Sequence, residues 1–194
     1  MIQLVGPGGA GKSTAGVLLA QRLGVTFVDL DEEFVAKVGD ISAFLDAHGY
    51  DAYAERNVSL YSALAKAERQ AVLPLSSGFM TYGPDIHPEY ARWRQDIAWS
   101  PSTFVLLPSL DLEASVAEIV RRQVTRPFAR SAEREELVIR ARFPIYVDIP
   151  ATKVVTMGPV AEVVEELVAA VAAQQGAAPD AALGLYHHDR ARRG

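Results

Sequence analysis

A short glycine-rich segment near the start of the chain constrains the fold more than any other feature. It lies between an apolar run and a stretch of helical character and reads Gly6-Pro7-Gly8-Gly9-Ala10-Gly11-Lys12-Ser13. This fits the pattern G-x-x-x-x-G-K-S/T, in which backbone N–H groups and the start of the next helix converge on phosphate oxygens. A strand, this loop and a helix in that order predict an α/β nucleotide-binding domain. The alternative, a glycine-rich turn without a ligand, is less favoured.

Each position of the loop carries a chemical expectation. Lys12 is expected to reach the β- and γ-phosphates of a nucleotide, and the hydroxyl of Ser13 to ligate Mg²⁺. The residues predicted to bind the nucleotide here are Gly8, Gly9, Ala10, Gly11, Lys12, Ser13 and Thr14.

The rest of the chain alternates between expected strands and expected helices. The strands are predicted at Ile2–Val5, Val25–Leu30, Ala71–Leu75, Thr103–Leu107 and Lys153–Met157. The helices are predicted at Lys12–Leu23, Asp40–Ala47, Ala52–Lys66, Glu89–Ile97, Asp111–Arg122, Ser131–Tyr146 and Val160–Ala173, with a break near Gly49 and mostly loop from 76 to 100. Near-continuous apolar strands between helices predict a three-layer fold, a central parallel sheet of about five strands flanked by helices. Pro74 is awkward in such a strand.

Composition limits the other possibilities. With 194 residues the chain fits one domain, predicted at 1–173, followed by a tail at 174–194. A net charge of −5 argues against nucleic-acid binding over a broad basic surface, although 15 arginines against 4 lysines leave room for a cationic pocket. The absence of cysteine excludes thiolate metal sites and cysteine nucleophiles. No apolar run is long enough for a signal peptide or a membrane span, so we expect a cytoplasmic protein with no membrane partner.

Two acidic residues narrow the reaction. Asp29 and Asp31 close the second predicted strand, and alternation along a strand would point both carboxylates the same way. Ligands of a parallel sheet lie at the carboxyl ends of its strands, beside the glycine-rich loop. One carboxylate is then expected to hold Mg²⁺ and the other to accept a hydrogen bond from a substrate hydroxyl. The competing interpretation is that both are solvated or cap the next helix.

At this point the sequence resembles the shikimate kinase family of small P-loop kinases. The resemblance runs from Met1 to roughly Ala173 and includes four ordered elements: the loop, Phe27-Val28-Asp29-Leu30-Asp31, Arg126-Pro127, and Arg142-Phe143-Pro144-Ile145-Tyr146. Gly158-Pro159 falls where the family's adenine-contacting loop lies. By resemblance, the cofactors are ATP and Mg²⁺, a lid spans about 123–134, and a substrate-binding region spans about 31–60.

The resemblance also implies a role for each matching residue. Ser13 and Asp29 would hold Mg²⁺, and Lys12 and Arg126 would contact the phosphates during catalysis. Asp31 would act on the acceptor hydroxyl. The remaining implied contacts are nucleotide binding at Pro159 and substrate binding at Gly78 and Arg142. An arginine suits a substrate carboxylate because its fork donates two parallel hydrogen bonds.

Two positions depart from the family's pattern. The family's Gly-Glu-x-x-Phe-Arg is here Gly49-Tyr50-Asp51-Ala52-Tyr53-Ala54, so Ala54 replaces a second substrate-binding arginine. Arg56 lies about 200° further around a helix and cannot take its place without a register change. The three glycines after the family's third strand become Ser76-Ser77-Gly78-Phe79. A phenylalanine there is expected to shrink the pocket or to line it for another substrate.

These observations predict an enzyme that phosphorylates a hydroxyl group of a small anionic metabolite with ATP, shikimate being the first-ranked acceptor. The alternatives are a kinase for another cyclitol, sugar acid or polyol, a nucleotide or nucleoside kinase, and a non-catalytic nucleotide-binding module. One of Arg121 and Arg122 is expected to face the nucleotide. The aromatic residues between 76 and 100 are expected to pack together, the alternatives being an altered acceptor pocket, a lid or an interaction surface. Oligomeric state is left open.

Overall fold

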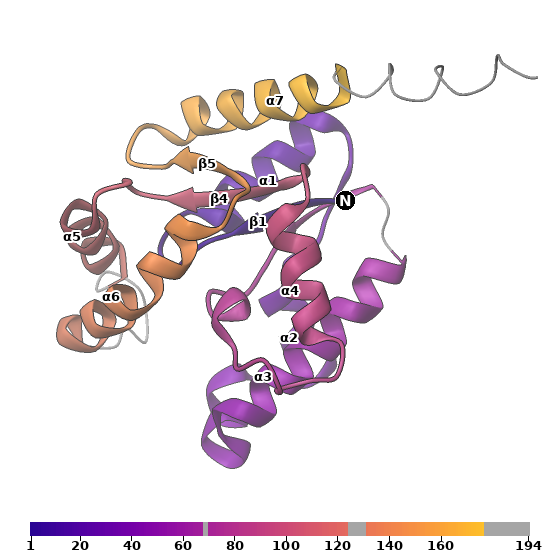
Figure 1. The fold of residues 1–194 in the computed structure, drawn as a ribbon, viewed down its shortest axis with the longest axis vertical. Coiled ribbons are helices and arrows are strands. Elements are labelled where there is room, and N and C mark those ends of the chain that lie inside the picture. Colours follow the sequence, from indigo (N-terminus) through magenta and orange to yellow (C-terminus); the bar gives the residue numbers. More distant parts are fainter. Residues whose placement is uncertain (68–69, 124–130, 177–194) are drawn as a thin grey trace, which may run out of the picture.

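A parallel sheet organises the molecule, which we describe from a computed structural model over residues 1–67, 70–123 and 131–176. Within that part of the chain the strands follow the order β2-β3-β1-β4-β5, and each paired neighbour is parallel (Figure 1). Their bounds are β1 Ile2–Val5, β2 Thr26–Phe27, β3 Ala71–Pro74, β4 Thr103–Leu107 and β5 Thr152–Val155. The predicted three-layer α/β fold is therefore confirmed.

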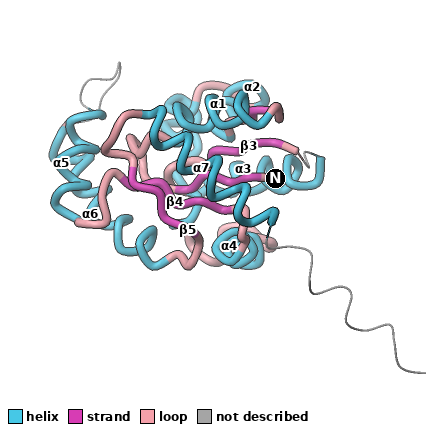
Figure 2. Tube along the Cα trace, turned by 90° about the horizontal axis from the view of Figure 1, so that it is seen from above, coloured by secondary structure: helices cyan, strands magenta, loops and turns pink. Residues whose placement is uncertain are grey.

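Alternation along the strands divides the core into two layers. Leu4 and Leu106 belong to a cluster formed with two helices on one face, whereas Val5 and Leu107 belong to a cluster on the other face. Figures 1 and 2 show α1 (Lys12–Leu23) and α7 (Val160–Gly176) on the first face. The opposite face is covered mainly by α3 (Ile41–Ala67) and α4 (Tyr90–Trp99). Burial on both faces explains why these strands read as continuous apolar runs.

The other helices are α2 Leu30–Lys37, the short 3₁₀ turn η1 Phe79–Thr81, α5 Leu112–Gln123 and α6 Ala132–Asp148. The predicted break in α3 is confirmed at Gly49, whose φ of 82° and ψ of 173° are not helical. The last helix continues to Gly176, beyond the predicted end at Ala173. The predictions for Arg126, for the centre of the 123–134 lid and for residues 177–194 lie outside the described residues. No described helix has the length and apolar character needed to cross a membrane.

The second predicted strand is wrong in its extent. Pairing of β2 ends at Phe27, and a helix that the sequence analysis did not predict, α2, starts at Leu30. The Asp29 side chain caps this helix by accepting a hydrogen bond from the Asp31 N–H, 2.9 Å away. Acidic residues in the first turn, Asp31, Glu32 and Glu33, suit the positive end of the helix. Asp29 and Asp31 therefore do not alternate along a strand, and the interpretation of Asp29 as a helix cap is confirmed.

Pro74 lies in a strand with neighbours on both sides. Residues 70 and 72 direct their carbonyls to β2, while the Leu75 N–H donates to Leu4 of β1. The missing N–H of Pro74 therefore points toward the β2 side, where the pairing has already ended at Phe27 and Val72. The sheet thus accommodates a proline without losing a ladder hydrogen bond.

The aromatic residues of the 76–100 segment mostly pack into the core, as expected. Tyr82 and Tyr90 are buried with ring centroids 5.7 Å apart, and Trp93 packs edge-on against Tyr61. Burial is the main cause that raises the pKa of Tyr90 to about 12. Trp99 differs, because 72% of it is exposed. These packed aromatic residues belong to the same core cluster as Tyr53 and Tyr146, which lie at the candidate site described below.

Leu106 tests the two-layer core. It is fully buried in β4, so Leu106→Ala should lower the free energy of unfolding by about 2–5 kcal/mol through lost burial and a residual cavity. The matched change Leu137→Ala, at a residue 70% exposed, should alter it by about 0.5 kcal/mol or less. Urea denaturation followed by circular dichroism measures both. Equal effects of the two changes would contradict the assigned core.

Candidate active site

The glycine-rich loop has the curled backbone that phosphate binding requires. Gly9 and Gly11 have φ angles of 75° and 90°, values that glycine adopts without strain. Lys12 is buried, and its Nζ donates to the carbonyl oxygens of Gly6 at 2.8 Å and Pro7 at 2.9 Å. These bonds hold the ammonium group across the mouth of the loop. The loop backbone and one fixed cation are thus in place for a polyphosphate.

A pocket of about 230 Å³ opens beside this loop. Its lining residues are Gly9, Gly11, Thr14, Ala15, Arg122, Thr156, Gly158, Val160 and Val163. They come from the loop, α1, the end of α5, the segment after β5 and the start of α7. Pro159 lies between two lining residues but does not itself line the pocket. The size and position suit the base of a nucleotide whose phosphates rest on the loop.

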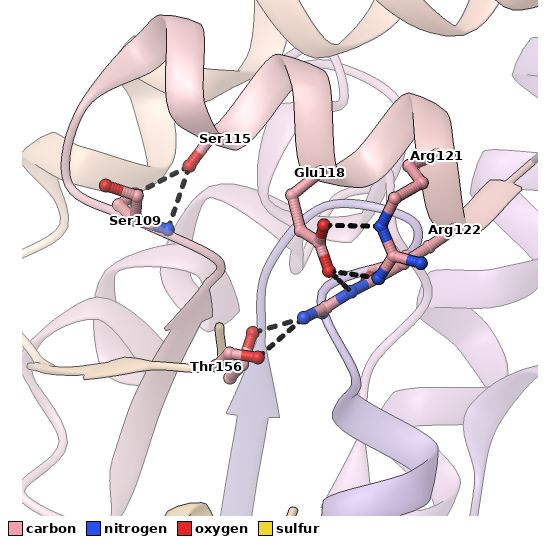
Figure 3. Close-up of polar contacts among 7 residues, drawn as sticks. Ser109, Ser115, Glu118, Arg121, Arg122 and Thr156 are labelled. Atoms are coloured by element: carbon pink, nitrogen blue, oxygen red, sulfur yellow. Dashed lines mark hydrogen bonds and ion pairs between the residues drawn. The ribbon is translucent and has the colours of Figure 1, made fainter. Parts of the chain in front are cut away.

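Arg122 joins the two sides of this pocket. Its Nη1 donates to the Gly9 carbonyl at 3.1 Å, and its Nη2 donates to the Thr156 carbonyl at 2.6 Å. Figure 3 shows Arg121 and Arg122 of α5 both reaching Glu118, with Arg122 extended to Thr156. Hydrogen bonds from Arg121 and then Arg122 lower the pKa of Glu118 to about 2, so this anchor stays ionised. Of the two candidate arginines, Arg122 is therefore the one that faces the nucleotide pocket.

Ser13 and Asp29 meet as the sequence predicts. The Ser13 hydroxyl donates to Asp29 Oδ2 at 2.6 Å, while Asp29 Oδ1 is occupied by the cap of α2. A hydroxyl and a carboxylate side by side are the hard oxygen ligands that Mg²⁺ prefers. Within the described residues no group of three or more acidic or histidine side chains gathers as a metal site. The donor set therefore fits a Mg²⁺ that takes its other ligands from water and phosphates.

Asp31 is held from one side by two hydroxyl groups. Ser76 and Tyr53 both donate to its Oδ1, the latter at 3.3 Å. Asn57 is fully buried and donates to both hydroxyl oxygens, to Ser76 at 2.9 Å and to Tyr53 at 3.2 Å. Because both bonds reach Oδ1, Oδ2 is the oxygen placed to accept a hydrogen bond from a ligand.

Burial is the main cause that raises the pKa of Asp31 above its ordinary value, and the neighbouring Asp29 carboxylate adds to it. The Ser76 hydroxyl and the Lys12 ammonium act in the opposite direction. The outcome is a carboxylate that is more basic than a solvated one and lies close to the phosphate-binding cation. That is the environment expected for a group that accepts a proton from an attacking hydroxyl.

The predicted substrate residues Gly78 and Arg142 lie together on the adjoining wall. Arg142, on α6, donates to the Ser77 carbonyl at 3.4 Å and to the Tyr50 hydroxyl at 3.0 Å. The Tyr146 hydroxyl donates to the same Ser77 carbonyl at 2.8 Å. Since Ser76 binds Asp31 and Ser77 binds Arg142, consecutive residues after β3 connect the two groups predicted to bind the acceptor.

The two departures have different structural outcomes. Ala54 is buried in the core, and Arg56 is exposed two residues further along the same helix. Phe79 is fully buried, and its ring packs against Tyr61 and Tyr82, with centroids 5.0 Å and 5.7 Å away. The expectation that Phe79 lines the acceptor pocket is therefore wrong, and the expectation that it shrinks the pocket stays a prediction.

Sequence reasoning missed Ser76, Asn57 and the hydroxyl of Tyr53 as parts of the site. Ser76 carried a usable signal, because it follows a buried strand at the carboxyl edge of the sheet, where ligand-binding residues gather. Asn57 carried a weaker one, as a polar residue among apolar neighbours on α3. Its pairing with Ser76, 19 positions away, depends on the tertiary fold.

The fold and site together define a class. A phosphate-binding loop after β1, a Ser–Asp pair suited to Mg²⁺ and a buried carboxylate at the same sheet edge are the parts of a P-loop kinase, an enzyme that transfers phosphoryl groups.

Comparison with known proteins specifies the family. The shikimate kinase family model matches residues 8–172. A shikimate kinase of Frankia casuarinae is 34% identical over 179 residues, which cover 88% of this chain and 71% of that protein. One of Xanthomonas euvesicatoria pv. vesicatoria is 30% identical over 177 residues, 88% of this chain and 91% of that protein. The chain belongs to the shikimate kinase family, whose members are phosphotransferases that use ATP and act on a hydroxyl group.

Solved structures agree at the level of the fold. Shikimate kinase from Acinetobacter baumannii, in complex with shikimate, has a TM-score of 0.71 and 24% identity, covering 90% of this chain and 93% of that chain. A gluconokinase from Sinorhizobium meliloti 1021 has a TM-score of 0.57 and 17% identity, covering 91% and 93%. The same layered architecture thus occurs in kinases named for different acceptors.

Arg122 offers a test of the nucleotide pocket. Arg122→Ala removes the charged hydrogen bonds that join Gly9 to Thr156 and should weaken ATP binding by about tenfold to a hundredfold. Its neighbour supplies the matched control, because Arg121 pairs with the same Glu118 but is exposed and is not among the pocket's lining residues. Arg121→Ala should change the Kd by less than about twofold. Isothermal titration with ATP measures both, and equal losses would refute the assignment of Arg122.

Proposed function

We propose that this protein transfers the γ-phosphoryl group of ATP to a hydroxyl group of shikimate, in a reaction that requires Mg²⁺. The observation that carries the proposal is the connection through Ser76 and Ser77, which ties Asp31 beside the phosphate loop to Arg142 on the acceptor wall. A hydroxyl acceptor bearing a carboxylate matches this pair, since Asp31 can take the hydroxyl proton while the guanidinium of Arg142 binds the anion. Shikimate has both groups.

The residues divide the work of the reaction. Lys12 and the loop backbone bind the phosphates, and Ser13 and Asp29 hold Mg²⁺, which supplies charge neutralisation when bound. Oδ2 of Asp31 orients the acceptor hydroxyl and accepts its proton as the oxygen attacks the γ-phosphorus. The bond to the β,γ-bridging oxygen breaks, and ADP leaves. Such a transfer is accelerated mainly by positioning and by charge stabilisation, which these groups provide.

Arg126 completes the proposal. It lies outside the described residues, and we assign it to stabilising charge on the moving phosphoryl group. Arg126→Ala should therefore lower kcat far more than it weakens ATP binding.

Because an ATP-dependent enzyme works where ATP is supplied, the proposal also places the protein in the cytoplasm.

The acceptor is tested directly by a panel. ATP consumption should be measured with shikimate and with other cyclitols, sugar acids and polyols, each at millimolar concentration. We expect turnover with shikimate to exceed that with every other acceptor. Ala54 leaves one cation fewer than the family's pattern, and this favours a sugar acid or polyol as the second candidate. Preferential turnover of one of these would establish that candidate, and no turnover with shikimate would reject the first.

Asp31 separates an enzyme from a nucleotide-binding module. Asp31→Asn keeps the shape of the side chain but removes the base, so kcat should fall by about a hundredfold or more while the Kd for ATP stays within about twofold. The exposed Asp85 provides the control, and Asp85→Asn should leave both quantities unchanged. Unaltered turnover in Asp31→Asn would remove Asp31 from the mechanism.

A further inference from the structure

Tyr50 lies at the point where the acceptor site meets the kink in α3. It directly follows Gly49, whose non-helical backbone lets the helix restart in a new direction. Its ring contacts Tyr53 and, edge-on, Tyr82, with centroids 6.1 Å and 5.9 Å away, and 44% of the residue is exposed. The hydroxyl is thus carried on a supported ring at the rim of the site.

The hydroxyl of Tyr50 and the guanidinium of Arg142 converge over Gly78. A Cβ atom added at Gly78 would lie 2.5 Å from the Tyr50 hydroxyl oxygen and 3.2 Å from Arg142 Nη2. The two polar groups are themselves 3.0 Å apart, and Nη2 donates to the hydroxyl oxygen. Three separate elements therefore bring a phenol, a cation and a bare stretch of backbone to one place.

Tyr50 is the polar side chain that contacts the guanidinium of Arg142 on this wall. Residue 54, one helical turn further along the same part of α3, is a buried alanine without a polar side-chain atom. The Tyr82 ring, which contacts Tyr50 edge-on, is buried, so its hydroxyl is not exposed to a ligand on this wall.

We propose that Tyr50 is a specificity-determining residue that binds the carboxylate of the acceptor together with Arg142. Without a ligand, the Tyr50 hydroxyl oxygen accepts the hydrogen bond that Arg142 Nη2 donates. When the acceptor enters, the carboxylate takes that position and accepts hydrogen bonds from Arg142 Nη2 and from the Tyr50 hydroxyl. The inference rests on the proposed function and deepens it.

This pair selects for charge. One guanidinium and one neutral phenol together offer a single positive charge, which matches a carboxylate and leaves a dianionic phosphate group undercompensated. The acceptor class that follows is a hydroxylated monocarboxylate.

The test uses the full chain with ATP and two acceptors, shikimate and its methyl ester, in which the carboxylate charge is absent. Tyr50→Phe removes only the hydroxyl and should raise the KM for shikimate by about tenfold, with kcat and the KM for ATP within about twofold of the unsubstituted protein. The KM for the methyl ester should not change. Trp99→Phe, at an exposed residue outside the site, is the control and should leave every constant unchanged.

The possible results separate the role of Tyr50 from the proposed function. An unchanged or lower KM for shikimate in Tyr50→Phe, or an equal rise with the methyl ester, would overturn the role of Tyr50. Tyr50→Leu, which also removes the ring, should raise the KM at least as much, and it serves if the Phe variant fails to melt like the unsubstituted protein. If the unsubstituted protein does not turn over shikimate, the proposed function falls with the inference; turnover with an unaffected variant removes Tyr50 alone.

Discussion

One carboxylate, that of Asp29, connects the parts on which the site depends. Its two oxygens accept from the Ser13 hydroxyl, at the start of α1, and from the Asp31 N–H, at the start of α2. The same side chain therefore caps the start of α2 and lies beside the Ser13 hydroxyl, with which we propose that it holds Mg²⁺. One group thus has a structural role in the fold and a proposed role in the reaction.

The fold could be predicted from the sequence because strands that are buried on both faces of a sheet are continuous apolar runs. Strands such as Thr103–Leu107 are continuous apolar runs, and the strand at Ile2–Val5 and the helix at Lys12–Leu23 fall where predicted. The prediction failed at Val25–Leu30, where local apolar character suggested a longer strand, but the capping preference of Asp29 ended the extended segment. Capping competes with strand propensity over two or three residues, and periodicity is too coarse to resolve it there.

The parts of the candidate site that lie close together in the sequence could be predicted, whereas the parts that are far apart in the sequence could not. The loop, Ser13 and Lys12 act through contiguous backbone, so a motif of eight residues contains them. The support of Asp31 by Ser76 and Asn57, and the meeting of Tyr50 with Arg142 across 92 positions, depend on how the layers pack. The sequence shows that Ala54 replaces the family's second substrate-binding arginine, but only the fold shows that the Tyr50 hydroxyl lies beside Arg142.

The kink at Gly49 has a consequence for how this protein can vary. A continuous helix transmits every insertion as a rotation of about 100° per residue, so a change in residues 41–48 would swing all later side chains around the axis. Because the helical phase restarts after Gly49, the part that carries Tyr50, Tyr53 and Asn57 is positioned by its own contacts, such as the hydrogen bond from Asn57 to Ser76 after β3. The packing of Phe44 against Phe34 ties the first half of α3 to α2, so a change in its length would have to preserve that contact, while the kink keeps the change from rotating Tyr50, Tyr53 and Asn57.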